Sequence, residues 1–118
     1  MQLMKMMIIS NYSKMKDILI KVRERGKKDE RTAEITIEGE FTIIYAATVK
    51  EKLIEVMDHY DRIEVKVTNL ENFDLSAVQL LVSLRKSMPP DKFKLTLLLR
   101  EDLKPILEHA GLKDILLN

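Results

Sequence analysis

The chain has 118 residues, of which 46% are apolar and 33% charged, with a net charge of +1 and no cysteine. These values are typical of a single globular domain, and they exclude disulfides, thiol catalysis and thiolate zinc sites. No apolar run is long enough for a membrane helix and no signal peptide is recognisable, so we expect a cytoplasmic protein.

The charge is distributed unevenly along the chain. Residues 1–32 carry nine Lys or Arg against four Asp or Glu, and residues 33–118 carry eleven against fifteen. The sequence therefore predicts a basic N-terminal arm (1–32) followed by a mildly acidic domain (33–118). The acidic domain alone is a poor nucleic-acid binder.

An apolar stripe in the basic arm predicts an amphipathic helix over residues 13–25. Its apolar residues recur at helical intervals, and Gly26 fits the left-handed position that follows a helix: the stripe consists of Met15, Ile18, Leu19 and Val22. We expect this helix to pack on its own domain or on a second copy, which would make a homodimer. Basic amphipathic helices also bind membrane surfaces.

Two strands and a helix are predicted next. Residues 34–38 alternate between apolar and polar, Gly39-Glu40 fits a tight turn, and residues 41–45 continue as a second strand, so we expect an antiparallel hairpin. Residues 46–60 carry apolar side chains at helical spacing.

The second half of the chain continues the alternation of strand and helix. A strand over 63–67 is followed by a polar loop over 69–73 and a helix that begins at Ser76, where Ser76-x-x-Gln79 fits a capping box. A strand over 93–99 follows. Asp102 is expected to cap a helix over 103–110, with a short helical piece over 112–117.

The predicted order β-β-α-β-α-β-α indicates an α/β domain. Strands linked by helical crossovers run parallel, and alternating strands are solvated on one face. We therefore expect a two-layer domain: a four-stranded mixed sheet with helices mainly on one face, plus the N-terminal helix. Ile44 and Leu98 break the polar face, and the N-terminal helix is expected to cover them.

Residues 33–117 resemble a STAS domain, the fold of bacterial anti-sigma factor antagonists. The likeness lies in the hairpin, the helix and strand that follow, the loop Asp74-Leu75-Ser76-Ala77-Val78, and the segment LKPILEHAGL at 103–112. In that family the loop usually reads Asp, any residue, Ser or Thr, then Gly. A partner serine kinase, which is also the anti-sigma factor, phosphorylates the Ser or Thr, and phosphorylation abolishes the binding of that kinase.

Carried over by position, the resemblance implies that Ser76 is the phosphoacceptor. It also implies that the loop that binds the partner contains Asp74, Leu75, Ala77 and Gln79. Ala77 stands where glycine is usual and Leu75 where a small polar residue is common, which indicates a divergent branch. For Asp74 two roles remain open: it orients the Ser76 hydroxyl, or it accepts hydrogen bonds from backbone amides in the loop.

We therefore expect a regulatory protein-binding module that switches partners when Ser76 is phosphorylated. Its partner would be a serine kinase of the anti-sigma factor type. An alternative is a STAS scaffold without a switch, or an accessory subunit of a transporter or chemosensory complex. A second alternative is binding to a membrane or nucleic-acid surface through the basic arm.

The sequence favours a binding module over an enzyme. It has no glycine-rich phosphate loop, no serine elbow and no metal-ligand spacing, so we expect no catalytic residue, no cofactor and no metal. The two histidines, His59 and His109, are expected at exposed helix ends. Any phosphoryl transfer would use Mg-ATP held by the partner.

Overall fold

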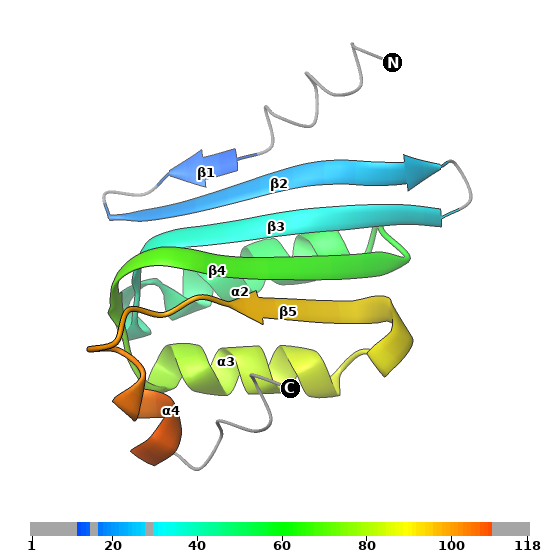
Figure 1. The fold of residues 1–118 in the computed structure, drawn as a ribbon. Helices are drawn as coiled ribbons and strands as arrows, with labels where there is room; N and C mark the ends of the chain where they lie inside the picture. The colour runs from blue at the N-terminus through cyan, green and yellow to red at the C-terminus, as the bar shows by residue number, and fades with distance from the viewer. Residues whose placement is uncertain (1–11, 15–16, 28–29, 110–118) are drawn as a thin grey trace.

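The computed structural model describes residues 12–14, 17–27 and 30–109, which form one sheet with helices packed against it (Figure 1). The strands are β1 (Tyr12–Lys14), β2 (Ile18–Lys27), β3 (Glu30–Phe41), β4 (Arg62–Phe73) and β5 (Phe93–Leu97). The helices are α2 (Ile43–Met57), α3 (Leu75–Lys86), the short 3₁₀ helix η1 (Pro90–Lys92) and α4 (Pro105–His109). None of the helices among these residues has the length and apolar content needed to cross a bilayer.

The sheet is mixed, with strand order β1-β2-β3-β4-β5. β2 pairs with β3 in antiparallel register, whereas β3 with β4 and β4 with β5 are parallel. The predicted α/β class and mixed sheet are thus confirmed. Four strands have five residues or more, and the three-residue β1 adds a fifth at the edge.

The predicted N-terminal helix is wrong, because residues 18–27 form strand β2. Ile18, Ile20 and Val22 are buried in alternation with solvent-facing Lys21 and Arg23, which is the period of a strand. Residues 18–27 and 30–32 are therefore part of the sheet, whereas the arm was expected to lie outside it. Met15, part of the predicted stripe, lies outside the described residues.

The predicted hairpin over 34–45 is also wrong, because β3 runs through Gly39 without turning. Gly39 has a φ of +101°, and the pairing of β3 with β4 shifts register on both sides of it. A Cβ at this position would lie 2.2 Å from the backbone oxygen of Asp17. Gly39 therefore forms a bulge where the chain passes close to Asp17. In sequence, a glycine at a bulge cannot be told from a glycine in a turn.

Helix α2 begins at Ile43, so the second strand of that hairpin does not exist and Ile44 is a helical residue. The loop predicted over 69–73 is the end of β4, which continues to Phe73. Asn69 interrupts this strand with a φ of +50°, a conformation that asparagine tolerates better than most residues. The polar sequence there marks an irregular strand end rather than a loop.

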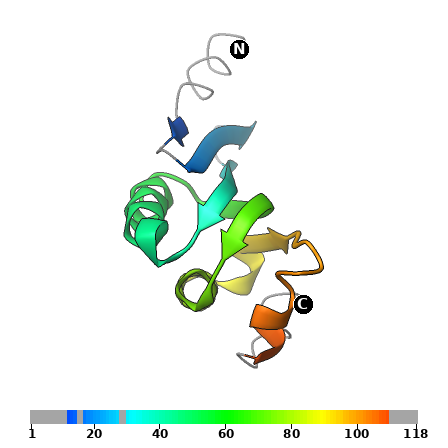
Figure 2. The same ribbon diagram turned by 90° about the vertical axis from the view of Figure 1, so that its left-hand side faces the viewer.

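The core lies between one face of the sheet and helices α2 and α3, which run along the same side (Figure 2). This is the predicted two-layer arrangement. The buried side chains alternate along β2 to β5 and recur at helical spacing in α2 and α3: they include Ile20, Ile35, Ile37, Ile63, Val65, Val67, Val49, Leu53, Val78 and Leu81.

The opposite face of the sheet carries cross-strand ion pairs. Arg23 Nη2 lies 2.9 Å from Glu34 Oε1, Arg25 Nε lies 2.6 Å from Glu34 Oε2, and Arg25 also pairs with Glu64 on β4. The basic charges of β2 are thus matched by carboxylates of the acidic domain. These ion pairs make the face polar and partly neutralise its basic side chains.

The C-terminal strand and helix agree in outline with those predicted from the sequence. β5 ends at Leu97, two residues before the predicted end. Leu98 is 52% exposed, and the described residues of the region expected to cover it form strands β1 and β2. Helix α4 begins at Pro105, after a turn that includes Asp102, and the predicted elements beyond His109 lie outside the described residues.

Candidate functional site

The side chain of Asp74 joins the starts of the two main helices. β3 and β4 are parallel and end at the same edge of the sheet, where Thr42 and Asp74 each connect a strand to a helix in an extended conformation. Asp74 Oδ1 accepts a hydrogen bond from the amide of Ala77 at 3.2 Å, and Oδ2 accepts one from the amide of Ile43 at 2.9 Å. Of the two roles considered for Asp74, acceptance from backbone amides is therefore confirmed.

Ser76 does not cap α3, so the predicted capping box is wrong. The helix begins at Leu75 and its N-cap is Asp74, which places Ser76 at the second helical position. The Asp74 carboxylate at the N-cap accepts the hydrogen bond from the amide of the third helical residue, Ala77, so the Ser76 hydroxyl is not needed as a cap. The Ser76 hydroxyl is partly exposed and makes no hydrogen bond with any described residue.

The other members of the predicted loop differ in exposure. Leu75 is 45% exposed, and Gln79 is exposed one turn further along α3. Ala77 is fully buried, so its methyl group belongs to the core. The part of the loop that a partner can reach therefore consists of Asp74, Leu75, Ser76 and Gln79.

Two exposed apolar residues lie next to this loop, and the sequence analysis did not connect them with it, because it placed both in a strand and expected Ile44 to be covered by the N-terminal helix. Ile43 and Ile44 are 71% and 72% exposed at the start of α2, and the hydrogen bond from Ile43 to Asp74 places them beside the start of α3. The buried stripe of α2 (Val49, Leu53 and Val56) indicates a helix but does not fix its start, so no local signal placed Ile43 and Ile44 in it. With Leu75 they form what we call the apolar rim: Ile43, Ile44 and Leu75.

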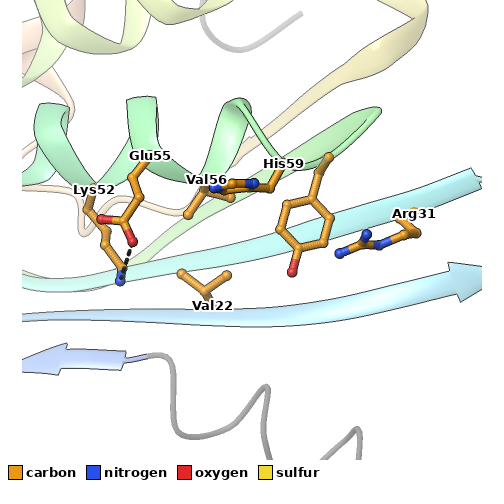
Figure 3. Close-up of a pocket in the computed structure, with 7 residues that line it drawn as sticks. Val22, Arg31, Lys52, Glu55, Val56 and His59 are labelled. Atoms are coloured by element: carbon orange, nitrogen blue, oxygen red, sulfur yellow. Dashed lines mark ion pairs between the residues drawn. The ribbon is translucent and has the colours of Figure 1, made fainter.

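A separate pocket of about 210 Å³ lies between the C-terminal half of α2 and strands β2 and β3 (Figure 3). Its floor is formed by Val22 and Val56. Polar groups surround the mouth: Arg31, Lys52, Glu55, His59 and Tyr60.

Each permanent cation of this pocket has a carboxylate partner. Arg31 Nε lies 3.2 Å from Glu24 Oε2, and Lys52 Nζ lies 3.9 Å from Glu55 Oε1. The Tyr60 hydroxyl also donates to Glu24 at 3.1 Å, and the Arg31 guanidinium lies 4.8 Å from the centre of the Tyr60 ring. The contacts among Glu24, Arg31 and Tyr60 connect strands β2 and β3 to the segment that follows α2. Since its charges cancel, the pocket supplies hydrogen-bonding groups but no net charge to attract an ion.

Burial raises the pKa of the Tyr60 phenol, and the hydrogen bond from the hydroxyl to Glu24 acts in the same direction. The nearby Arg31 guanidinium opposes both effects. His59 and His109 are exposed at helix ends, as predicted. Among the described residues, no group of three or more His, Asp or Glu side chains is arranged to hold a metal ion.

Comparison with known proteins assigns the chain to a family. A family model described as STAS domain matches residues 26–118. A crystal structure of an anti-sigma factor antagonist from Mycobacterium paratuberculosis is similar in fold, with a TM-score of 0.60, 11% sequence identity and 81% of each chain covered. The curated proteins contain no match to this chain. The family model covers most of the chain, including the strand-to-helix junction with Asp74 and Ser76, and the chain therefore belongs to the STAS domain family.

Proposed function

We propose that this STAS domain is a regulatory protein-binding module of the anti-sigma factor antagonist type, and that phosphorylation of Ser76 switches its binding. The observation that carries the proposal is the Ser76 hydroxyl itself. It is partly exposed, forms no hydrogen bond with a described residue, and is free of the capping role that would otherwise explain it.

The surroundings of Ser76 fit a protein partner. The apolar rim exposes three large aliphatic side chains at the starts of two helices that share the Asp74 carboxylate. Single exposed aliphatic residues are common, but three of them at two adjoining helix starts, next to a modifiable hydroxyl, favour a contact surface. The partner would bury Ile43, Ile44 and Leu75 together with the exposed parts of Asp74 and Gln79.

Phosphorylation would weaken such a contact for two physical reasons. A phosphate adds about −1.5 to −2 charges, and burying it against apolar side chains costs its hydration. It would also stand two residues from the Asp74 carboxylate and repel it. In the transfer step the Ser76 oxygen would attack the γ-phosphorus of ATP, ADP would leave, and the hydroxyl proton would pass to a base. The kinase would supply ATP, Mg²⁺ and that base, and this chain would be the substrate in the cytoplasm.

Intact-mass measurement of the protein from its native host tests the modification. We expect a population heavier by one phosphate, with the phosphate located on Ser76 by fragmentation. A serine that stays unmodified under all growth conditions would contradict the switch.

Binding assays with partner captured from the same host test the consequence. We expect Ser76→Ala to retain a partner that Ser76→Asp releases. Ser83→Asp is the matched control, because Ser83 is an exposed serine two turns further along α3. Equal retention by all variants would instead favour the scaffold without a switch, and release by Ser83→Asp would mean that negative charge on α3 acts nonspecifically.

The alternative that relies on the basic arm loses part of its basis. Arg23, Arg25 and Arg31 are paired with carboxylates within the domain. These charges are partly neutralised where they lie, so they contribute less to attraction of a membrane or nucleic acid.

A further inference from the structure

Helix α2 depends on a residue from another segment for its start. Thr42 occupies the N-cap position but its side chain makes no capping hydrogen bond, and its buried Oγ1 has no partner among the described residues. Neither α2 nor α3 has an acidic residue in its first turn. The Asp74 carboxylate is thus the one side chain in the described structure that accepts an amide at both helix starts.

We propose that Asp74 transmits the state of Ser76 to the first turn of α2, so that Ile43 and Ile44 respond to a phosphate placed on α3. This inference rests on the proposed function, in which Ser76 carries the phosphate. It adds a second part of the molecule to the switch, because Ile43 belongs to a segment 31 residues earlier in the sequence.

The physical argument is competition for backbone amides. The unpaired amides of a helix start attract anions, and a phosphate on Ser76 would be a stronger acceptor for the first amides of α3 than the carboxylate. The two anions repel each other as well. A carboxylate that moves away from Ala77 cannot keep its geometry toward Ile43, since the same rigid group makes both hydrogen bonds.

The consequence falls on the apolar rim. Without Asp74 the amide of Ile43 loses its acceptor, and Thr42 does not replace it. The first turn of α2 would then fray, and the exposed side chains of Ile43 and Ile44 would lose their fixed orientation. A partner that contacts both helix starts would thus meet an added charge on α3 and a frayed first turn of α2.

Nuclear magnetic resonance of the full chain with phosphoserine inserted at position 76 during translation tests this coupling. We expect the amide proton of Ile43 to shift in the direction, and by about the amount, that Asp74→Ala produces. Phosphoserine at position 83 should leave the Ile43 resonance in place. The amide of Leu81 in the core of α3 serves as the check that the fold is intact.

The decisive comparison adds the phosphate to the Asp74→Ala protein. If Asp74 is the transmitter, most of the phosphate-induced shift of Ile43 disappears in this background. If Asp74→Ala does not fold, Asp74→Asn takes its place, because its single amide oxygen can bond only one of the two amides well. An Ile43 shift of the same size without Asp74, or no shift at all in the natural background, would overturn the inference.

These outcomes are independent of the proposed function. The phosphoserine is inserted during translation, so the coupling can be measured whether or not a kinase modifies Ser76 in the host. Conversely, an unmodified Ser76 in the host would contradict the switch while the coupling remained intact.

Discussion

Replacing Asp74 with alanine should destabilise the domain at two helix starts together. The carboxylate accepts from Ala77 at 3.2 Å and from Ile43 at 2.9 Å. Loss of an N-cap costs about 1 kcal/mol, within a range of roughly 0.5–2. Because Asp74 is partly exposed, water can replace each lost acceptor in part, and we expect about 2 kcal/mol in total. For a domain of this length that free energy corresponds to a fall in Tm of roughly 8 °C.

Asp74→Asn separates the two hydrogen bonds. Its side chain keeps one acceptor oxygen, so about half of the loss should remain, or roughly 1 kcal/mol. Urea denaturation followed by circular dichroism measures both free energies of unfolding. Asp61→Ala is the control, because the Asp61 side chain is exposed and forms no hydrogen bond with the described residues, and this variant should stay within about 0.5 kcal/mol of the natural protein.

The order of the free energies of unfolding of Asp74→Ala, Asp74→Asn and Asp61→Ala tests whether Asp74 caps both helices. An alanine variant as stable as Asp61→Ala would refute the double cap. An asparagine variant as unstable as alanine would show that a single acceptor stabilises neither helix, and the reasoning from two separate bonds would fail.

Three further outcomes follow from other parts of the fold. Gly39→Ala should lose on the order of 2–3 kcal/mol in thermal unfolding, because a Cβ would lie 2.2 Å from the Asp17 oxygen at a positive φ. Absorbance titration of the tyrosines should lose one of its components of raised pKa in Tyr60→Phe and keep the one that belongs to Tyr45, whose pKa is also raised by burial. Since the folded pKa of Tyr60 is raised, its contribution to stability is complete below the unfolded value of about 10 and is lost as the pH rises through the folded value, and the total loss should be smaller in the phenylalanine variant, where only Tyr45 still contributes in this way. Arg23→Ala should lower the free energy of unfolding by at most about 1 kcal/mol in denaturation, because its ion pair with Glu34 is exposed. A larger loss would show that the ion pairs on this face stabilise the fold more than exposed pairs usually do.

The parts of the fold that could be predicted are those whose pattern is local. The alternation of Ile63, Val65 and Val67 and the stripe through Leu81 on α3 each lie within one element, and both describe the structure correctly. The N-terminal strand was missed because Ile18 and Val22 fit both a helical and a strand period. What distinguishes the two is the pairing of β2 with β3, which a local pattern does not contain.

The candidate site shows the same division. The sequence pattern located Ser76 and Asp74 at the start of a helix, but it assigned the cap to the wrong one of the two. It could not predict that Asp74 also accepts the amide of Ile43, because that contact depends on β3 and β4 ending at one edge of the sheet. Ile43 and Ile44 were therefore placed in a strand, although they form part of the exposed rim.

The central position of β3 has a consequence for the order of folding. Its pairing with β2 joins residues close in sequence, such as Lys27 with Glu30, whereas its pairing with β4 joins residues about thirty apart, such as Thr32 with Arg62. Contacts between neighbours in the chain form faster, because closing a short loop loses less entropy. We expect pulsed hydrogen exchange during refolding to protect the β2–β3 amides before those of β4, and simultaneous protection would contradict this order. The junction that holds Asp74 can be completed only after β4 docks, so a newly made chain would acquire its partner surface late.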